Sequence, residues 1–198
     1  MESEHEALVH KQSCSREGGY TADDLDQLPG LRAHTELIDG SLVPRQPQNM
    51  FHMRTVTALE QHLIRRTPAE LEVIREMTVT LDRRNRPEPD LMLVRADADT
   101  GLDQTTYHPE DVLLAVEVAS PDSVARDRGA KPQKYAAAGI RHFWRVENDE
   151  GRPIVYVYEL DPAKNEYVPT GIHHDQLKLT EPFPIDVDLN EIRAGRAR

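Results

Sequence analysis

The sequence predicts one α/β domain, in which segments with helical spacing alternate with short strand-like segments. Its 198 residues suffice for one domain with a hydrophobic core and are too few for two domains of ordinary size. The run 112–119 is the most apolar in the chain and lacks the alternation of a half-exposed strand. We therefore expect this run to lie in the centre of a sheet.

The composition indicates a globular protein without membrane spans or disulfide bonds. Hydrophobic residues make up 38% of the chain, which is enough for a core. No apolar run approaches the roughly 20 residues of a membrane span, and the polar N-terminus lacks the apolar stretch of a signal peptide. The single cysteine, Cys14, excludes an internal disulfide and a cysteine zinc cluster. These features predict a cytoplasmic protein with no membrane contact.

The formal net charge of −11 argues against a protein that binds nucleic acid by bulk electrostatics. Such a chain can still meet a polyanion through a local basic face, or through divalent metal held by clustered carboxylates. Positive charge is concentrated in one segment, which either holds phosphates or forms an ordinary solvated surface. The members of this basic segment are Arg126, Arg128, Lys131, Lys134, Arg141 and Arg145.

The N-terminal third predicts a leader, a short helix, a hairpin and a longer helix. Residues 1–19 are polar and aperiodic, as in a disordered leader. Thr21 is suited to cap a short helix by accepting hydrogen bonds from the exposed amides. An Asp-Gly pair within 36–43 predicts a tight hairpin turn, and Asn49 should cap an amphipathic helix that stops before Pro68.

The middle of the chain predicts two strands, the central strand and a second helix. Segments 71–81 and 91–94 are rich in β-branched or apolar residues and predict neighbouring strands. After the central run, a Ser-Pro-Asp-Ser sequence offers caps for a helix that continues to about Ala138. Pro132 lacks a backbone N–H, so regular helix should begin only around Lys131.

The C-terminal part predicts a strand pair followed by less regular structure. Gly139 should end the preceding helix. Segments 142–147 and 154–160 predict strands joined by a tight turn, and short strand fragments should follow. The main domain is expected to span 20–190, with a frayed tail over 191–198.

Glu117 is the most informative residue, because it stands in the middle of the central apolar run. A carboxylate buried in a strand costs several kcal/mol unless a cation or several hydrogen-bond donors meet it. A metal ion or a catalytic role would explain its presence. The alternatives are a structural ion pair and a carboxylate at the exposed end of the strand.

Asp90 stands at the mouth of an apolar strand, in the sequence Pro87-Glu88-Pro89-Asp90. The prolines hold the chain extended, which keeps the acid at the sheet edge. Taken alone, Asp90 is better explained as an ordinary loop aspartate. Together with Glu117 on an adjacent strand, it can place oxygens around one point, as Mg²⁺ requires.

Asp127, Lys131 and Tyr135 are spaced by four residues and predict one face of the helix that follows Glu117. The first turns of this helix can lean over the end of the sheet, so the long lysine stem can carry its ammonium to the carboxylates. The alternative is an ordinary ion pair between Asp127 and Lys131 on a solvated helix face.

The order of these motifs resembles that of the Uma-type restriction endonucleases, a branch of the PD-(D/E)XK nuclease superfamily. This resemblance implies a restriction-endonuclease-like α/β core, with a mixed central β-sheet flanked by helices. The superfamily places a lysine two residues after the second acid, where this chain has Ala119; the branch's own pattern places it at Lys131. The motifs that carry the resemblance are Glu36 to Gly40, Pro89-Asp90, Val116 to Pro121 and Asp127 to Gly139, within Tyr20 to Leu160.

By this resemblance the protein is an endonuclease that uses Mg²⁺ or Mn²⁺ to hydrolyse phosphodiester bonds of DNA. Asp90 and Glu117 would hold the metal ion, together with a strand carbonyl near Val118. Lys131 would orient the attacking water and offset charge in the transition state.

The resemblance also implies roles for three further residues. Glu36 matches the family's N-terminal acid and would complete the metal shell, unless it is a surface glutamate of the hairpin. Asp127 and Tyr135 would support the site by positioning the lysine and its helix.

Three other functions compete with this interpretation. The first is a catalytically inactive nuclease fold that acts as a DNA-binding or protein-interaction module. The second is a metal-dependent hydrolase of another phosphoester, because the phosphate chemistry is shared. The third is a structural protein, which Glu117 disfavours. For the nuclease, the expected partner is nucleic acid in the form of duplex DNA, and a homodimer is expected because cleavage of both strands often needs two active sites.

Overall fold

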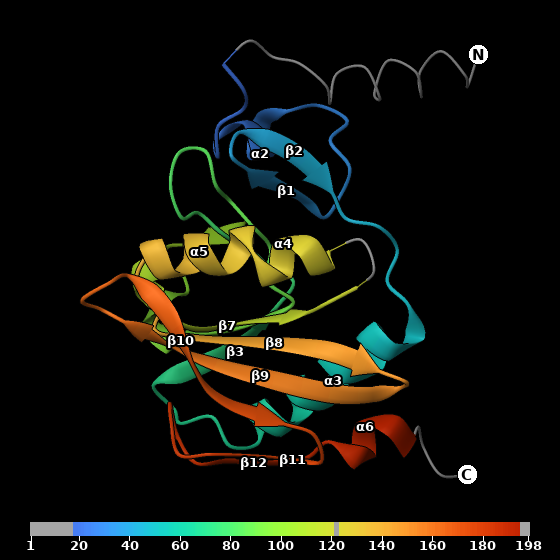
Figure 1. The fold of residues 1–198 in the computed structure, drawn as a ribbon. Coiled ribbons are helices and arrows are strands. Elements are labelled where there is room, and N and C mark those ends of the chain that lie inside the picture. Colours follow the sequence, from blue (N-terminus) through green and yellow to red (C-terminus); the bar gives the residue numbers. More distant parts are fainter. Residues whose placement is uncertain (1–17, 121–122, 195–198) are drawn as a thin grey trace.

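The structure is a computed structural model that describes residues 18–120 and 123–194 of the chain. Its centre is a six-stranded mixed sheet with helices on both faces (Figure 1). This confirms the predicted α/β class with a mixed central sheet. In spatial order the strands are β10 (Glu166–His173), β9 (Arg152–Asp161), β8 (His142–Asp149), β7 (Val112–Val118), β5 (Leu91–Arg95) and β3 (Leu71–Arg75).

The predicted central strand is confirmed as β7, which lies between β5 and β8. The pairing of β7 with β8 is parallel, and the other pairs in this sheet are antiparallel. Helix α3 (Met50–Ile64) covers one face of the sheet, here called the α3 face. Helices α4 (Val124–Arg128) and α5 (Ala130–Ala137) cover the other, here called the α5 face (Figure 1).

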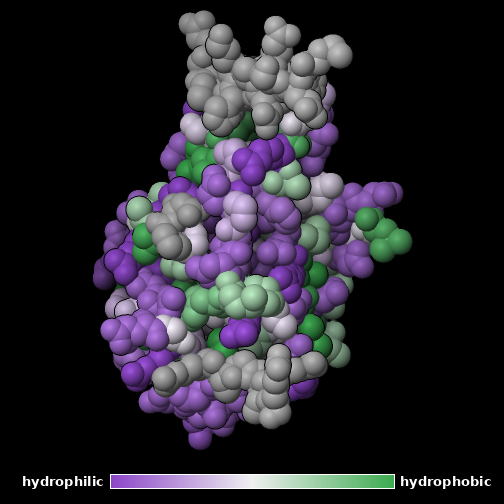
Figure 2. Space-filling model, turned by 90° about the vertical axis from the view of Figure 1, so that its right-hand side faces the viewer, coloured by the Kyte–Doolittle hydropathy of each residue, from purple (hydrophilic) through white to green (hydrophobic). Residues whose placement is uncertain are grey.

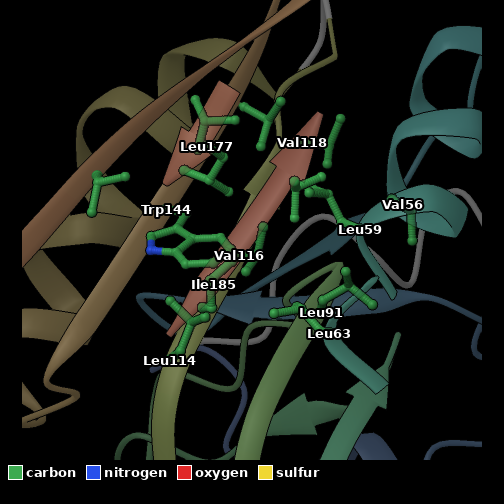
Figure 3. Close-up of a cluster of buried hydrophobic side chains, with 14 of the residues drawn as sticks. Val56, Leu59, Leu63, Leu91, Leu114, Val116, Val118, Trp144, Leu177 and Ile185 are labelled. Carbon is green, nitrogen blue, oxygen red and sulfur yellow. The ribbon is translucent and has the colours of Figure 1, made fainter. Parts of the chain in front are cut away.

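Alternate residues of the strands supply two hydrophobic clusters, one on each face of the sheet. On the α3 face, Val116 and Trp144 pack with residues of α3 such as Leu59 (Figure 3). On the α5 face, Ala115 and Phe143 pack around Tyr135 of α5. Because side chains alternate along β7, Glu117 belongs to the α5 face together with Ala115.

Two local predictions for the N-terminal half are confirmed. Strands β1 (Thr35–Ile38) and β2 (Ser41–Pro44) form the predicted hairpin. Asp39 and Gly40 have the positive φ angles, 53° and 78°, that its tight turn requires. Asn49 caps α3, because its side-chain oxygen accepts a hydrogen bond from the His52 amide at 2.9 Å.

The prediction for Thr21 is wrong in its chemistry. The short helix α2 (Asp24–Gln27) begins after Asp23, and the Asp24 amide donates to the backbone carbonyl of Thr21 at 3.0 Å, not to its side chain. Instead the Thr21 amide and hydroxyl both donate to the Asp24 carboxylate, at 2.7 and 2.9 Å. The acid therefore takes the role of acceptor that we expected of the threonine.

The predicted strand 71–81 is broken in the structure. Strand β3 ends at Arg75, and Glu76 turns the chain with a φ of 51°. The chain then forms β4 (Thr78–Val79), which pairs in parallel with β6 (Thr106–Tyr107), and leaves the large sheet. The apolar pattern continues through Glu76 without glycine or proline, so nothing local marks the break. As predicted, β3 and β5 are neighbours.

The helix predicted to run from 123 to about Ala138 is two helices, α4 and α5, that meet at Gly129. Pro132 explains the break, because in one continuous helix its ring would clash with the carbonyl of Arg128 and it could not donate a hydrogen bond to it. The helix that contains Pro132 starts at Ala130, one residue before the predicted position, but regular helix is already present in α4 from Val124, which the prediction missed. Gly139, with a φ of 85°, leads the chain out of α5 as predicted.

The C-terminal part is more regular than the sequence predicts. The predicted strand pair is β8 and β9, and it is followed by the eight-residue strand β10. Strands β11 (Gln176–Leu179) and β12 (Ile185–Asp188) pack on the α3 face, where Leu177 and Ile185 join the core (Figure 3). Short 3-10 helices span Ala96–Ala98 and Pro109–Asp111.

The C-terminal end forms a helix where a frayed tail was predicted. Helix α6 (Asn190–Ala194) buries Ile192, so the frayed tail predicted over 191–198 begins too early. A helix of five residues with one apolar anchor leaves little sequence signal. Residues 195–198 lie outside the described residues, as do residues 1–17 of the expected leader.

The surface carries few large hydrophobic side chains. On the side shown in Figure 2, hydrophilic residues cover most of the surface and the hydrophobic ones form small separate groups. None of the helices in the described ranges has the length and hydrophobicity that crossing a bilayer requires. The more exposed large hydrophobic residues are Met50, Met53, Ile64, Leu102, Val168 and Ile172.

Candidate active site

Glu117 is buried between β7 and α5 and is held by two residues of that helix. Its side chain is on the α5 face and the residue is 1% exposed. The Lys131 ammonium donates to both carboxylate oxygens, at 3.0 and 3.1 Å. The Tyr135 hydroxyl donates to Oε1 at 2.6 Å. The lysine expected two residues after the acid is absent at Ala119, but the ammonium from α5 reaches the same carboxylate.

Lys131 joins acids from three separate elements. Its ammonium lies 2.7 Å from Oε1 of Glu36 on β1, 3.0 Å from Glu117 and 3.6 Å from Oδ1 of Asp127 on α4. All three acids are 1% exposed, so Glu36 is not a surface glutamate of the hairpin and Asp127 does not pair with Lys131 on a solvated face. Oε1 of Glu36 also accepts a hydrogen bond from the Glu88 amide at 2.9 Å.

Asp90 adjoins Glu117 through the backbone of β7. Its Oδ2 accepts a hydrogen bond of 2.6 Å from the amide of Val118, the residue that follows Glu117. The residue is 1% exposed, so it is not an ordinary loop aspartate. Its other oxygen forms an ion pair with Arg45 and lies 3.0 Å from Nε2 of His52.

The structure therefore brings all six residues predicted for the site into one buried cluster. Asp127 contacts the lysine, as predicted. Tyr135, in contrast, bonds to the Glu117 carboxylate.

Two residues of the site were not predicted from the sequence. Arg45 follows β2 and donates to Glu88 as well, at 3.2 Å to its carbonyl and 3.3 Å to its carboxylate. His52 lies in the first turn of α3 and is 2% exposed. Its spacing to Val56 and Leu59 places it on the buried face of the helix, which is a signal that the sequence did contain.

The basic segment does not form one continuous phosphate-binding face. Lys131 is buried in the site, and Lys134 extends to Asp39 of the hairpin turn at 2.5 Å. Arg128 and Arg145 share Glu147 on β8, at 2.5 and 2.7 Å.

The site holds more buried acids than cations. Five buried carboxyl groups face two cations, so full ionisation of the acids would leave an excess of three negative charges before any histidine is protonated. Arg45 is one of these cations, with a side chain that is 12% exposed, and Lys131 is the other. Such an excess is costly in a buried environment unless protons or a further cation offset it. The five acids are Glu36, Glu88, Asp90, Glu117 and Asp127.

The pKa values of the two central acids shift in opposite directions. Burial raises the pKa of Glu117 well above its usual value, with the charges of Asp127 and Asp90 acting in the same sense, and Lys131 offsets this only in part. Burial alone would also raise the pKa of Asp90, but the contacts with His52 and Arg45 outweigh it and lower that pKa.

The pKa values of the residues on the helices follow from the same environment. Burial raises the pKa of Asp127. Burial by itself would lower the pKa of Lys131, but the charges of Glu117, Glu36 and Asp127 outweigh it and raise the pKa above its usual value. The ammonium of Lys131 is therefore protonated at neutral pH. Burial, together with the charge of Glu117, also raises the pKa of Tyr135.

The donor chemistry of the site suits a hard divalent cation. Asp90 and Glu117 offer carboxylate oxygens, which Mg²⁺ prefers, and the acid excess favours an additional positive charge. Within residues 18–120 and 123–194, however, no three acidic, histidine or cysteine side chains converge in a metal-binding group. In this structure Arg45 and Lys131 are the partners of these carboxylates instead.

Comparisons with known proteins agree with this fold. A family model for Uma2, described as "Putative restriction endonuclease", matches residues 22–191. The solved structure of a "putative nuclease belonging to DUF820" from Anabaena variabilis superposes with a TM-score of 0.68 at 14% identity, covering 88% of this chain and 97% of that one. The search of curated proteins found no match. Because the family model spans the hairpin, the central sheet and every residue of the site, the chain belongs to the Uma2 family.

Proposed function

We propose that the protein is a metal-dependent nuclease that hydrolyses phosphodiester bonds of DNA at the site around Glu117. The observation that carries this proposal is the convergence of Asp90, Glu117 and Lys131 from three elements in one buried, acid-rich site. Membership in a family described as restriction endonucleases supports the reaction class. Duplex DNA as the substrate, a homodimer as the acting form and a cytoplasmic location belong to the same proposal.

Asp90 and Glu117 would hold Mg²⁺ or Mn²⁺, together with the carbonyl of Val118. When bound, such an ion polarises the phosphate, helps to form hydroxide and stabilises the leaving oxygen. Asp90 is paired with Arg45 and Glu117 with Lys131 in this structure, so the two carboxylates would have to exchange protein cations for the ion.

The protonated Lys131 acts as a cation and hydrogen-bond donor, because its raised pKa makes it a poor base. It would orient the attacking water and offset charge on the pentavalent phosphorus in the transition state. Glu36 and Asp127 hold the ammonium in place from two sides. Tyr135 fixes Glu117, so that the carboxylate and the ammonium keep one relative orientation.

A second candidate function is a nuclease-fold module that binds DNA or protein without cleaving it. One observation favours it: Asp90 and Glu117 are 1% exposed and already paired with protein cations. In that case the acid–cation cluster stabilises the fold, and no substrate reaches it.

The test is cleavage of plasmid and oligonucleotide DNA with Mg²⁺ or Mn²⁺, comparing the parent with Asp90→Ala, Glu117→Ala and Lys131→Ala. Asp103→Ala, at an exposed loop position, is the matched control. We expect each site variant to lose at least about 100-fold in rate, the scale of a single electrostatic catalytic group, and the control to cleave like the parent. Activity that survives all three changes contradicts the proposed site. A folded parent that binds DNA but does not cleave it supports the inactive module.

A further inference from the structure

A groove on the α5 face has features that the proposed catalytic residues do not use. It lies between α5 and the hairpin formed by β9 and β10, which rises beside that helix (Figure 1). Its volume is about 480 Å³, within the range of small-molecule sites. Its lining includes Arg128 and Gln133 from the helices, Arg145 from β8, and Tyr158, Lys164 and Asn165 from the hairpin.

The register of the sheet places this groove next to Glu117. Glu117 of β7 pairs with Arg145 of β8, and Arg145 pairs in turn with Tyr156 of β9. Paired residues of neighbouring strands point to the same face, and neighbouring strands lie about 4.8 Å apart. Arg145 therefore stands on the α5 face, one strand away from the proposed catalytic carboxylate.

The groove gathers three basic side chains in an otherwise acidic chain. Arg128 and Arg145 share the single carboxylate of Glu147, so this trio keeps one net positive charge. Lys164 also lines the groove, with a side chain that is 67% exposed and an ammonium 3.3 Å from Asp161. Glu166 adds one acid to the lining. Arg128 donates its Nε and Nη2 hydrogens to Glu147 and Arg145 its Nε hydrogen, so the remaining guanidinium N–H groups are those that can bind phosphate oxygens.

The floor of the groove is aromatic. The Arg145 guanidinium lies over the rings of Tyr156 and Tyr158, at 4.5 and 5.5 Å from their centroids, which fixes its direction. Tyr158 lines the groove and packs against Phe143, 5.6 Å away between centroids. Tyrosine rings are platforms on which nucleobases stack, whatever their sequence.

Two side-chain amides complete the polar lining. Gln133 of α5 and Asn165 of the hairpin turn are both exposed. Within the described ranges neither amide has a side-chain partner. Amides donate and accept at once, as the edges of nucleobases do. Cations, an aromatic floor and unengaged amides are the three elements of nucleotide recognition.

We propose that this groove binds one nucleotide of a nucleic-acid strand, next to the bond that is cleaved. Its phosphate lies on Arg128 and Arg145, and its base lies against Tyr158 within reach of Gln133. This inference rests on the proposed function, because it takes the Glu117 site to be the place where the strand is cleaved. The groove itself is tested by binding, without cleavage.

The binding test uses a fluorescein-labelled single-stranded DNA oligonucleotide in EDTA at low salt, with fluorescence anisotropy as the readout. Arg145→Gln should weaken binding about 10-fold, the effect of one charged hydrogen-bond partner. The slope of log affinity against log salt should become shallower by about 0.7 for the lost phosphate contact. Lys164→Gln, at an exposed position, should act in the same direction. The matched control is Lys178→Gln on β11, which removes the same charge from the strand pair on the opposite face.

The aromatic floor has its own pair of variants. Tyr158→Leu should weaken binding by about 5-fold or more, the lower end of the effect of one base–aromatic stack. Tyr158→Phe keeps the ring and should bind like the parent. The fluorescence of Trp144, buried on the α3 face, reports whether each variant is folded.

The outcomes separate the groove from the proposed function. If Arg145→Gln and Lys164→Gln bind like Lys178→Gln, or if the parent binds no oligonucleotide, the groove inference is wrong whatever the cleavage assay shows. If thymidine 5′-monophosphate competes at the affinity of the oligonucleotide, the groove takes a free nucleotide and the inference of a strand fails. If the folded parent hydrolyses neither DNA nor bis(p-nitrophenyl) phosphate, the proposed function fails, while groove-dependent oligonucleotide binding still supports the groove.

Discussion

Replacing Lys131 with methionine should destabilise the protein far more than replacing Glu117 with glutamine. Lys131→Met leaves Glu36, Glu117 and Asp127 buried together without the ammonium that contacts all three. Removing one partner of a buried ion pair costs about 3–5 kcal/mol. With a methionine of similar length in place of the lysine stem, packing is largely kept, so the change reports the charge.

Glu117→Gln removes one ionisable acid from a site in which buried carboxyl groups outnumber cations by three. The amide oxygen can still accept from Tyr135 and Lys131, and the ammonium keeps Glu36 and Asp127 as partners. The lost charge-assisted hydrogen bond costs about 1.5–3 kcal/mol, and relief of repulsion among the acids offsets most of it. We expect a net change within about 1 kcal/mol, the scale of an ordinary single substitution.

Urea unfolding measures both changes, followed by the fluorescence of Trp144, which is 1% exposed and is the single tryptophan of the chain. The Lys131→Met/Glu117→Gln double variant should recover part of the loss, because it removes one of the stranded acids. If Glu117→Gln destabilises as much as Lys131→Met, the site is a balanced ion pair and the reasoning from acid excess is refuted.

Two further predictions concern protons and metal. Between pH 4.5 and the raised pKa of folded Glu117, the folded state binds more protons than the unfolded state, so the free energy of unfolding should fall as pH rises. Urea titrations at several pH values should show this slope in the parent and a smaller one in Glu117→Gln; equal slopes would assign the effect to other groups. Mg²⁺ or Mn²⁺ at 100 times the dissociation constant should raise the free energy of unfolding of the parent by about 2.7 kcal/mol, seen as a higher thermal midpoint, and EDTA should reverse the shift. Asp90→Asn should abolish the shift, whereas a parent that does not respond contradicts the proposed metal ligands.

The residues predicted for the site share a feature that sequence can reveal: each stands out against its own local pattern. Glu117 interrupts an apolar strand, and Asp90 follows two prolines at the start of another. Lys131 belongs to a stripe with a period of four, so one helix face carries it toward the acids.

Arg45 and His52 could not be assigned in the same way, because their roles arise from residues distant in the sequence. Asp90, which both contact, is 45 residues after Arg45. No local sequence pattern predicts that the end of the hairpin and the first turn of α3 will both lie next to the start of β5. The roles of Arg45 and His52 follow only from how the hairpin and the helix pack against the sheet.

The fold shows the same division between local and distant causes. Asp39-Gly40 and Asn49 specify their turn and cap through the chemistry of one or two residues. The breaks at Glu76 and Gly129 are different. Pro132 makes the break at Gly129 partly predictable from the sequence. The break at Glu76 depends on the pairing of β4 with β6, which lies 28 residues further along the chain.

The number of acids around Lys131 favours the proposed functional cluster over a structural ion pair. A structural role for Glu117 requires one cation, and Lys131 supplies it. A purely structural role for Glu117 does not explain why Glu36 and Asp127 are buried against the same ammonium, where their charges raise the pKa of Glu117 further. Proteins tolerate such a buried excess where a ligand of opposite charge completes the site, at the expense of stability in its absence. A divalent ion and the lysine together would balance these carboxylates, which a second ion pair elsewhere in the fold cannot do.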